Sequence, residues 1–127
     1  MANNVFIRDW LLNGEQDREQ LIRYLNEVRA KNNVFISYVI SNQSRYYYRT
    51  TSEVSGVLRV LSENDIRDAW FFRVKKMEQP FEFNINPDRA HQNNMTLFIN
   101  YKVHDYQGEF IGVAGVGLTL KIISNLL

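Results

Sequence analysis

The amino-acid sequence predicts an α+β domain with a central antiparallel sheet of about five strands. Two observations support this class. An amphipathic helical pattern occupies the N-terminal part of the chain, and strand-like segments joined by short turns follow it. Strands connected in this way pair antiparallel, and helices pack on the resulting sheet. The 127 residues, 45% of them apolar, suit one packed domain, so residues 1–127 are expected to form a single unit.

A long helix is expected near the N-terminus. Apolar side chains recur every three or four positions over residues 17–31, with polar side chains between them. Asp17 and Gln20 have the spacing of a capping box, and the pair at 32–33 is a stop signal. An earlier apolar turn, residues 10–12, is followed by Asn-Gly, which indicates a break between two helical pieces.

A β-hairpin and a second helix are expected next. Residues 34–40 and 46–51 are rich in β-branched and aromatic side chains, as strands are. Residues 62–65 form a helix start signal and Pro80 a stop. The helical stripe between them consists of Ile66, Ala69, Trp70, Val74 and Met77.

In the second half of the chain the hydrophobic period changes to two. Residues 81–85 predict a strand before the turn signal at 86–88. Residues 95–104 and 109–118 predict the strongest hairpin of the chain, and residues 119–127 resemble the opening of another helix. Within the first strand of that hairpin, Tyr101 faces away from Phe98 and Asn100.

Composition excludes several function classes. The 15 basic and 14 acidic residues leave a formal charge of +1, so nucleic acid is not an expected partner. The chain has no cysteine, and its two histidines, His91 and His104, lack metal-ligand spacing. We therefore expect no metal site, no cofactor and no catalytic residue. No apolar run is long enough to span a membrane.

The glycine-rich segment 112–117 lies inside a predicted strand. It lacks the Lys-Ser/Thr pair that ends a phosphate-binding loop. Its glycines either permit close packing of a helix or leave room for a pocket wall. The sequence alone leaves both interpretations open.

The segment Asp65–Val74 contains the most informative candidates for a binding site. It places Trp, Arg and acidic residues at the start of a short helix, where free N–H groups favour an anion. Trp70 would supply a rigid wall, and Arg73 or Arg67 would bind the two oxygens of a carboxylate. The alternative is that Trp70 belongs to the core while both arginines are solvated.

Several motifs occur in a characteristic order. After the long helix and a strand pair with the tyrosines 46–48 come Asp68-Ala-Trp-Phe-Phe-Arg73, Asn84-Ile-Asn-Pro-Asp88 and a closing hairpin with the segments 97–101 and 112–118. With Asp9-Trp-Leu-Leu-Asn-Gly-Glu15 near the start, this layout resembles the PAS-like subdomain of bacterial extracytoplasmic Cache (PDC) sensors. The resemblance covers nearly the whole chain.

The resemblance implies a sensor that binds a small molecule and has no catalytic activity of its own. The chain would be the membrane-distal, periplasmic piece of a homodimeric inner-membrane receptor, attached to the membrane only through missing flanking helices. Domains of this kind are fused to diguanylate cyclases, histidine kinases or chemoreceptors, and the resemblance favours a diguanylate cyclase or a histidine kinase as the missing output. The alternative is a cytoplasmic PAS-type dimerisation module without a bound small molecule.

The resemblance also bears on the ligand. Family members that bind amino acids usually have an Asp in the last strand and an Arg two positions before the Trp, where this chain has Gly117 and Asp68. It therefore favours an organic acid over an amino acid. The expected ligand-binding residues are Trp70, with Arg73 as first and Arg67 as second choice of charge partner, the hydroxyls of Tyr48 and Tyr101, Asp88 from a covering loop, and Gly115 and Gly117 leaving space.

Overall fold

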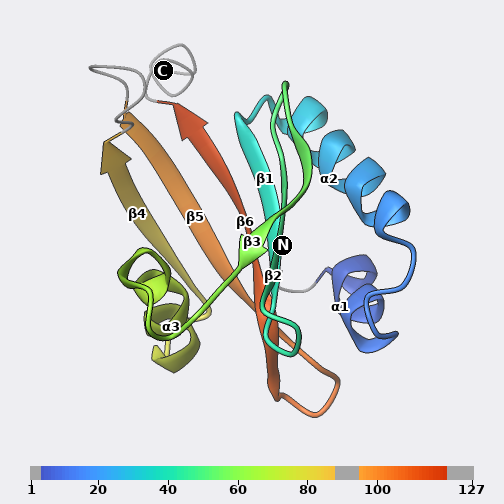
Figure 1. Ribbon diagram of the computed structural model, residues 1–127, viewed down its shortest axis with the longest axis vertical. Helices are drawn as coiled ribbons and strands as arrows, with labels where there is room; N and C mark the ends of the chain where they lie inside the picture. Colours follow the sequence, from blue (N-terminus) through green and yellow to red (C-terminus); the bar gives the residue numbers. More distant parts are fainter. Residues whose placement is uncertain (1–3, 88–94, 120–127) are drawn as a thin grey trace.

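The computed structural model describes residues 4–87 and 95–119, which form a six-stranded antiparallel sheet with helices on both faces (Figure 1). The strand order is β3-β2-β1-β6-β5-β4. This confirms the predicted α+β class. The elements are α1 (Val5–Leu12), α2 (Arg18–Asn32), β1 (Ile36–Ser41), β2 (Tyr46–Thr50), β3 (Ser55–Val60), η1 (Ile66–Asp68), α3 (Ala69–Lys76), β4 (Phe81–Pro87), β5 (Met95–His104) and β6 (Phe110–Thr119).

Helices α1 and α2 begin and end where the local sequence indicates. The side chain of Asn4 accepts a hydrogen bond from the backbone N–H of Ile7 and starts α1. The side chain of Asp17 accepts one from the N–H of Gln20 at 3.1 Å, which confirms the expected N-terminus of α2. Asn33, in the left-handed conformation that asparagine tolerates, ends α2. The predicted break between the two helices is therefore confirmed.

Both predicted hairpins form. Strands β1 and β2 pair antiparallel with Tyr38 opposite Arg49, and β5 pairs with β6 with Ile99 opposite Val116. Strand β6 also pairs with β1, which places Gly115 opposite Tyr38 at the centre of the sheet. The closing helix expected over 119–127 lies outside the described residues from position 120 onward.

Two details differ from the sequence prediction. Strand β3 was not expected, because it is an edge strand whose Val57, Leu58 and Val60 are all exposed, so it lacks an alternating pattern. The second helix also has a different buried face. A turn of 3₁₀ helix, η1, precedes α3 and shifts the helical phase, which leaves Ile66 89% exposed and turns Phe71 into the core.

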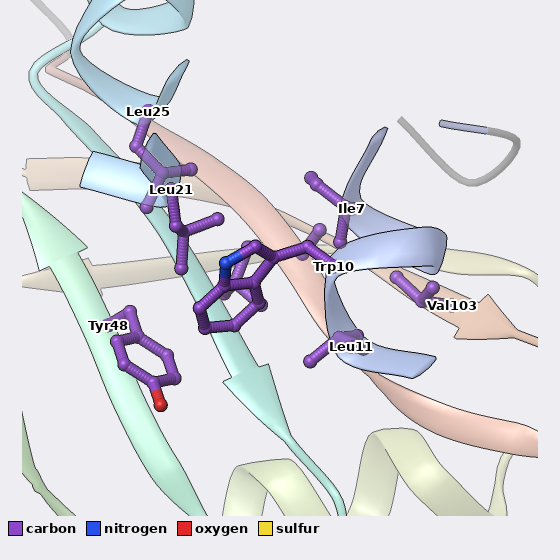
Figure 2. Packing of buried hydrophobic residues seen from close by; sticks show 9 residues of the cluster. Ile7, Trp10, Leu11, Leu21, Leu25, Tyr48 and Val103 are labelled. Carbon is purple, nitrogen blue, oxygen red and sulfur yellow. The ribbon is translucent and has the colours of Figure 1, made fainter. Parts of the chain in front are cut away.

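Alternation of side chains divides the core into two clusters, one on each face of the sheet. On the first face, Trp10 of α1, Leu21 and Leu25 of α2 and Tyr48 of β2 converge (Figure 2). On the second face, α3 packs against β1 and β6. The buried residues of this second cluster are Ile36, Tyr38, Ile40, Leu61, Phe71, Val74 and Val113. The α3 face is the one that carries the candidate site.

Candidate ligand-binding site

A pocket of about 210 Å³ lies on the α3 face of the sheet. Strands β1, β2, β4 and β5 contribute its floor and sides, and the η1–α3 segment contributes the remaining wall. The sheet thus brings together residues that lie far apart in the sequence. The lining residues are Tyr38, Tyr47, Arg67, Trp70, Asn84, Phe98 and Asn100.

Aromatic rings form most of the pocket wall. The ring of Tyr38 is central, with centroids of Tyr47 at 5.7 Å, Phe98 at 6.2 Å and Trp70 at 6.3 Å. Tyr47 and Trp70 also contact each other, at 6.4 Å. The mutual edge-on and tilted contacts hold the rings in fixed positions, so the wall is preorganised for a small ligand.

A chain of polar contacts runs along one side of the pocket. The hydroxyl of Tyr38 donates to Oδ1 of Asn100, and Nδ2 of Asn100 donates to Oε1 of Glu82 at 3.1 Å. Nη2 of Arg73 donates to the same Glu82 oxygen at 2.7 Å. Glu82 is mostly shielded while Arg73 is about half exposed. The carboxylate next to the pocket is therefore already neutralised by an arginine.

Arg67 is the cation that lines the pocket, and Asp65 holds it in place. Nε and Nη2 of Arg67 donate to the Asp65 carboxylate, with a shortest distance of 2.6 Å. Asp65 also accepts the backbone N–H of Arg67 as the cap of η1, at 2.9 Å. These bonds hold the pKa of the Asp65 carboxyl well below its usual range. The Nη1 group of Arg67 is not used by Asp65.

A second ion pair connects η1 to the edge of the sheet. The carboxylate of Asp68 is buried and pairs with the guanidinium of Arg59 on β3. Arg59 also lies 3.5 Å from Asp65, and Asp68 accepts the backbone N–H of Ser62 at 2.9 Å. Strand β3 thus fixes the turn that carries Arg67.

Burial keeps the pocket phenols neutral. It raises the pKa of Tyr38 well above its ordinary value and that of Tyr47 to about 12. Desolvation is the main cause in both cases, because it disfavours a charged phenolate. At neutral pH both side chains are therefore protonated.

The structure brings two of the expected site residues into the pocket, Trp70 and Arg67. Arg73, the first choice of charge partner, does not line it. Its side chain is about half exposed, and its guanidinium is paired with the Glu82 carboxylate. The second choice, Arg67, is the arginine that lines the pocket, and it lies on η1, immediately before the helix that carries Trp70.

Tyr48 and Tyr101 do not line this pocket, and both lie on the opposite face of the sheet. Tyr48 is buried under α1 and α2, where its hydroxyl donates to Glu15 at 2.7 Å. Tyr101 lies opposite Ala114 of the same face, and its ring is tilted against that of Phe81 with the centroids 5.7 Å apart. In each case the neighbour in sequence, one residue away, points to the pocket side instead.

The glycines also have a different role from the expected one. A Cβ at Gly115 would overlap the ring of Tyr38 and the carbonyl of Ile99, and one at Gly117 would come within 3.1 Å of the Phe98 ring. The space they leave is thus filled by pocket side chains rather than by a ligand. Asp88 lies outside the described residues.

Five lining residues were missed by the sequence analysis, namely Tyr38, Tyr47, Asn84, Phe98 and Asn100. A usable signal existed for two of them. Phe98 and Asn100 share a strand face, and an amide in an otherwise apolar central strand needs a polar neighbour. Tyr101, which the sequence analysis named instead, lies on the other face of that strand.

Within the described ranges, no three His, Cys, Asp or Glu side chains lie close enough together to hold a metal ion. His104 packs against the ring of Phe110, and His91 lies outside the described residues. None of the helices in the described part has the length and apolar character needed to cross a membrane.

Comparison with known proteins shows a fold likeness to bacterial sensory domains. No protein-family model matches the chain. The sensory domain of the Campylobacter jejuni chemoreceptor Tlp3 (CcmL) with isoleucine bound is similar, with a TM-score of 0.68 and 17% identity over 98% of this chain and 48% of that chain. Its ligand-binding domain in complex with L-valine gives 0.67 and 17% over 98% and 49%. The chain thus spans about half the length of these domains.

Proposed function

We propose that this chain is the ligand-binding part of a bacterial sensor and that a small organic anion occupies the pocket beside Trp70. The observation that carries the proposal is the aromatic pocket with Arg67 at its edge. The Arg67 side chain is 71% exposed at the pocket edge, and its guanidinium binds a carboxylate through charge-assisted hydrogen bonds from Nη1, which Asp65 does not engage. The fold likeness to chemoreceptor sensory domains supports the same role.

The favoured ligand is an organic acid without an amine. None of the residues that line the pocket is acidic, and the two carboxylates bonded to lining residues, Asp65 and Glu82, are paired with Arg67 and Arg73. An ammonium group would therefore lose its hydration without gaining a counter-ion. The two similar domains were solved with isoleucine and L-valine, so amino acids are the competing class that an experiment must include.

The proposed setting follows from the same resemblance. The chain would lie in the periplasm as part of a homodimeric inner-membrane receptor, and catalysis would belong to an output domain such as a diguanylate cyclase or a histidine kinase. The similar solved domains come from a chemoreceptor, so a chemotaxis output is equally compatible. Sequencing the complete gene identifies the output domain directly.

One observation favours a second candidate, a PAS-type interaction module. The side chains of Phe81, Phe83 and Ile85 on β4 are exposed, at 41%, 63% and 53%, and lie on one face of an edge strand. Such a surface is suited to contact with another protein. A module of this kind would dimerise and would bind none of the small molecules tested below.

The test of ligand binding uses two carbon skeletons, each with a hydroxyl, a keto or an amino group at the α-carbon. The panel consists of α-hydroxyisovalerate, α-ketoisovalerate and L-valine, together with lactate, pyruvate and L-alanine. A ligand at ten times its Kd adds about 1.4 kcal/mol to folding stability, or roughly 4 °C in the melting temperature of a domain this size. Calorimetry then gives the Kd of each compound that raises the melting temperature.

Variants assign the binding to the pocket. Arg67→Ala and Trp70→Ala should each weaken binding of the carboxylate at least tenfold, because they remove the cation and one aromatic wall. Arg23→Ala is the matched control, since Arg23 is exposed on α2 and far from the pocket face. Equal affinity in wild type and in both pocket variants would refute the site. Binding of the amino acids alone would refute the preference for an organic acid.

A further inference from the structure

The Arg73–Glu82 ion pair lies next to the pocket but does not line it. Because this pair lies at the end of the polar chain, it determines the direction of the hydrogen bonds that lead into the pocket. Arg73 and Asn100 both donate to Oε1 of Glu82, at 2.7 and 3.1 Å. Tyr38 closes the chain by donating to the amide oxygen of Asn100.

The direction of this chain is fixed by chemistry. An ionised carboxylate accepts hydrogen bonds and cannot donate them. Asn100 must therefore turn its NH2 group toward Glu82, which leaves its oxygen to face Tyr38. Tyr38 donates its only hydroxyl hydrogen to that oxygen. The phenol oxygen of Tyr38 can therefore accept a hydrogen bond from a ligand in the pocket, but it cannot donate one.

We propose, building on the carboxylate site of the preceding section, that the pocket selects α-hydroxy acids over α-keto acids. The carboxylate binds Arg67, and the hydroxyl of the ligand donates to the phenol oxygen of Tyr38. A keto oxygen at the same position would face the lone pairs of that phenol and form no bond. Glu82 and Arg73 act as positioning residues, since neither lines the pocket.

The Arg73–Glu82 ion pair also disfavours amino acids as ligands. An ammonium group can donate to the Tyr38 oxygen, but it brings a positive charge toward a carboxylate that Arg73 already neutralises. Removing the arginine should therefore free Glu82 for an amine. This makes Arg73 a determinant of ligand class although it is about half exposed and lies outside the pocket wall.

The experiment measures ratios of affinity for the three isovaleryl compounds by calorimetry. In the wild type, α-hydroxyisovalerate should bind roughly fivefold to tenfold more tightly than α-ketoisovalerate, the range expected for one neutral hydrogen bond. In Glu82→Gln the new amide can donate to Asn100, which allows the chain to reverse and Tyr38 to donate into the pocket. The hydroxy-to-keto ratio should then fall to about one or invert.

Three further variants test the individual links. Tyr38→Phe should weaken binding of the hydroxy acid and leave the keto acid nearly unchanged. Arg73→Met should raise the affinity for L-valine relative to the hydroxy acid. Tyr48→Phe is the matched control, because it removes a phenol hydroxyl on the opposite face and should leave every ratio unchanged. Circular dichroism and melting curves confirm that each variant is folded.

The outcomes separate this inference from the proposed function. Equal binding of the hydroxy and keto acids to the wild type, or an unchanged ratio in Glu82→Gln, overturns the selectivity while the carboxylate site at Arg67 stands. If neither acid binds, or if their binding does not depend on Arg67, both the selectivity and the proposed function are wrong. A ratio that changes in Glu82→Gln and Tyr38→Phe but not in Tyr48→Phe supports the inference.

Discussion

Replacement of Arg59 by methionine should destabilise the domain and loosen the turn that carries Arg67. Arg59 lies on β3 and pairs with Asp68, whose side chain is 1% exposed, while Arg59 itself is 24% exposed. Methionine keeps much of the aliphatic volume of the side chain and removes its charge. The substitution therefore leaves a buried carboxylate without its counter-ion.

The magnitude follows from the burial of the pair. Removing one partner of a buried ion pair costs about 3–5 kcal/mol. Asp68 keeps the hydrogen bond from the backbone of Ser62, at 2.9 Å, and Arg59 is partly open to water. The loss should therefore be at the lower end, about 3 kcal/mol, or roughly 10 °C in melting temperature.

Urea unfolding of the wild type and of three variants provides the assay. Arg59→Met alone should lose about 3 kcal/mol, whereas Arg59→Met combined with Asp68→Leu should recover much of the loss, since an apolar pair avoids the desolvation of both charges. Arg23→Ala, which breaks an exposed pair with Glu19, should change stability by less than about 0.5 kcal/mol. A loss below about 1 kcal/mol for Arg59→Met, or a double variant no more stable than the single one, would refute the reasoning.

Three further predictions concern the two faces of the sheet. Glu15→Ala should lower the free energy of unfolding by about 2–3 kcal/mol, because this carboxylate accepts hydroxyl hydrogen bonds from Tyr48 and two serines. Glu15→Gly should cost about 1 kcal/mol less, since Glu15 has a φ of 60°, which glycine adopts without strain. Urea unfolding of both variants measures the difference. Gly115→Ala should lower the melting temperature and displace Tyr38, whose ring a Cβ would overlap, and a normal melting curve would contradict this. Stability should also fall above pH 10, because burial raises the pKa of Tyr38 and that of Tyr47 to about 12. The unfolded chain then releases protons that the folded chain retains, at about 1.4 kcal/mol per pH unit for each phenol, and Tyr47→Phe should reduce the slope of urea stability against pH between 10 and 12.

The parts of the fold that the sequence predicts are those that local chemistry determines. The Asp17 cap, the stop at Asn33 and the alternation over 95–104 each depend on residues that are adjacent or nearly so. Strand β3 depends instead on pairing with β2, since its own side chains are exposed on both faces. The phase of α3 depends on η1, a turn whose 3₁₀ geometry the spacing of apolar residues does not reveal.

The candidate site shows the same division. Trp70 and Arg67 are identifiable because one short segment carries both of them. The sheet residues are not, because membership of the pocket depends on which face a strand presents, and an error of one residue reverses the face. Tyr47 and Tyr48 are adjacent in the sequence, yet one lines the pocket and the other is buried under α1 and α2.

The two faces also explain why the residues around the pocket are not interchangeable. Tyr38 lies opposite Gly115, and only a residue without a Cβ leaves room for a phenol at the centre of the sheet. The hydroxyl of Tyr38 then donates to Asn100 on β5, and Asn100 donates to Glu82 on the edge strand β4. The direction of these hydrogen bonds is thus set three strands away from the tyrosine, by a carboxylate that is paired with an arginine of α3. The conservative substitutions Glu82→Gln and Tyr38→Phe are therefore expected to change which ligand binds while the domain still folds, whereas Gly115→Ala affects the fold itself.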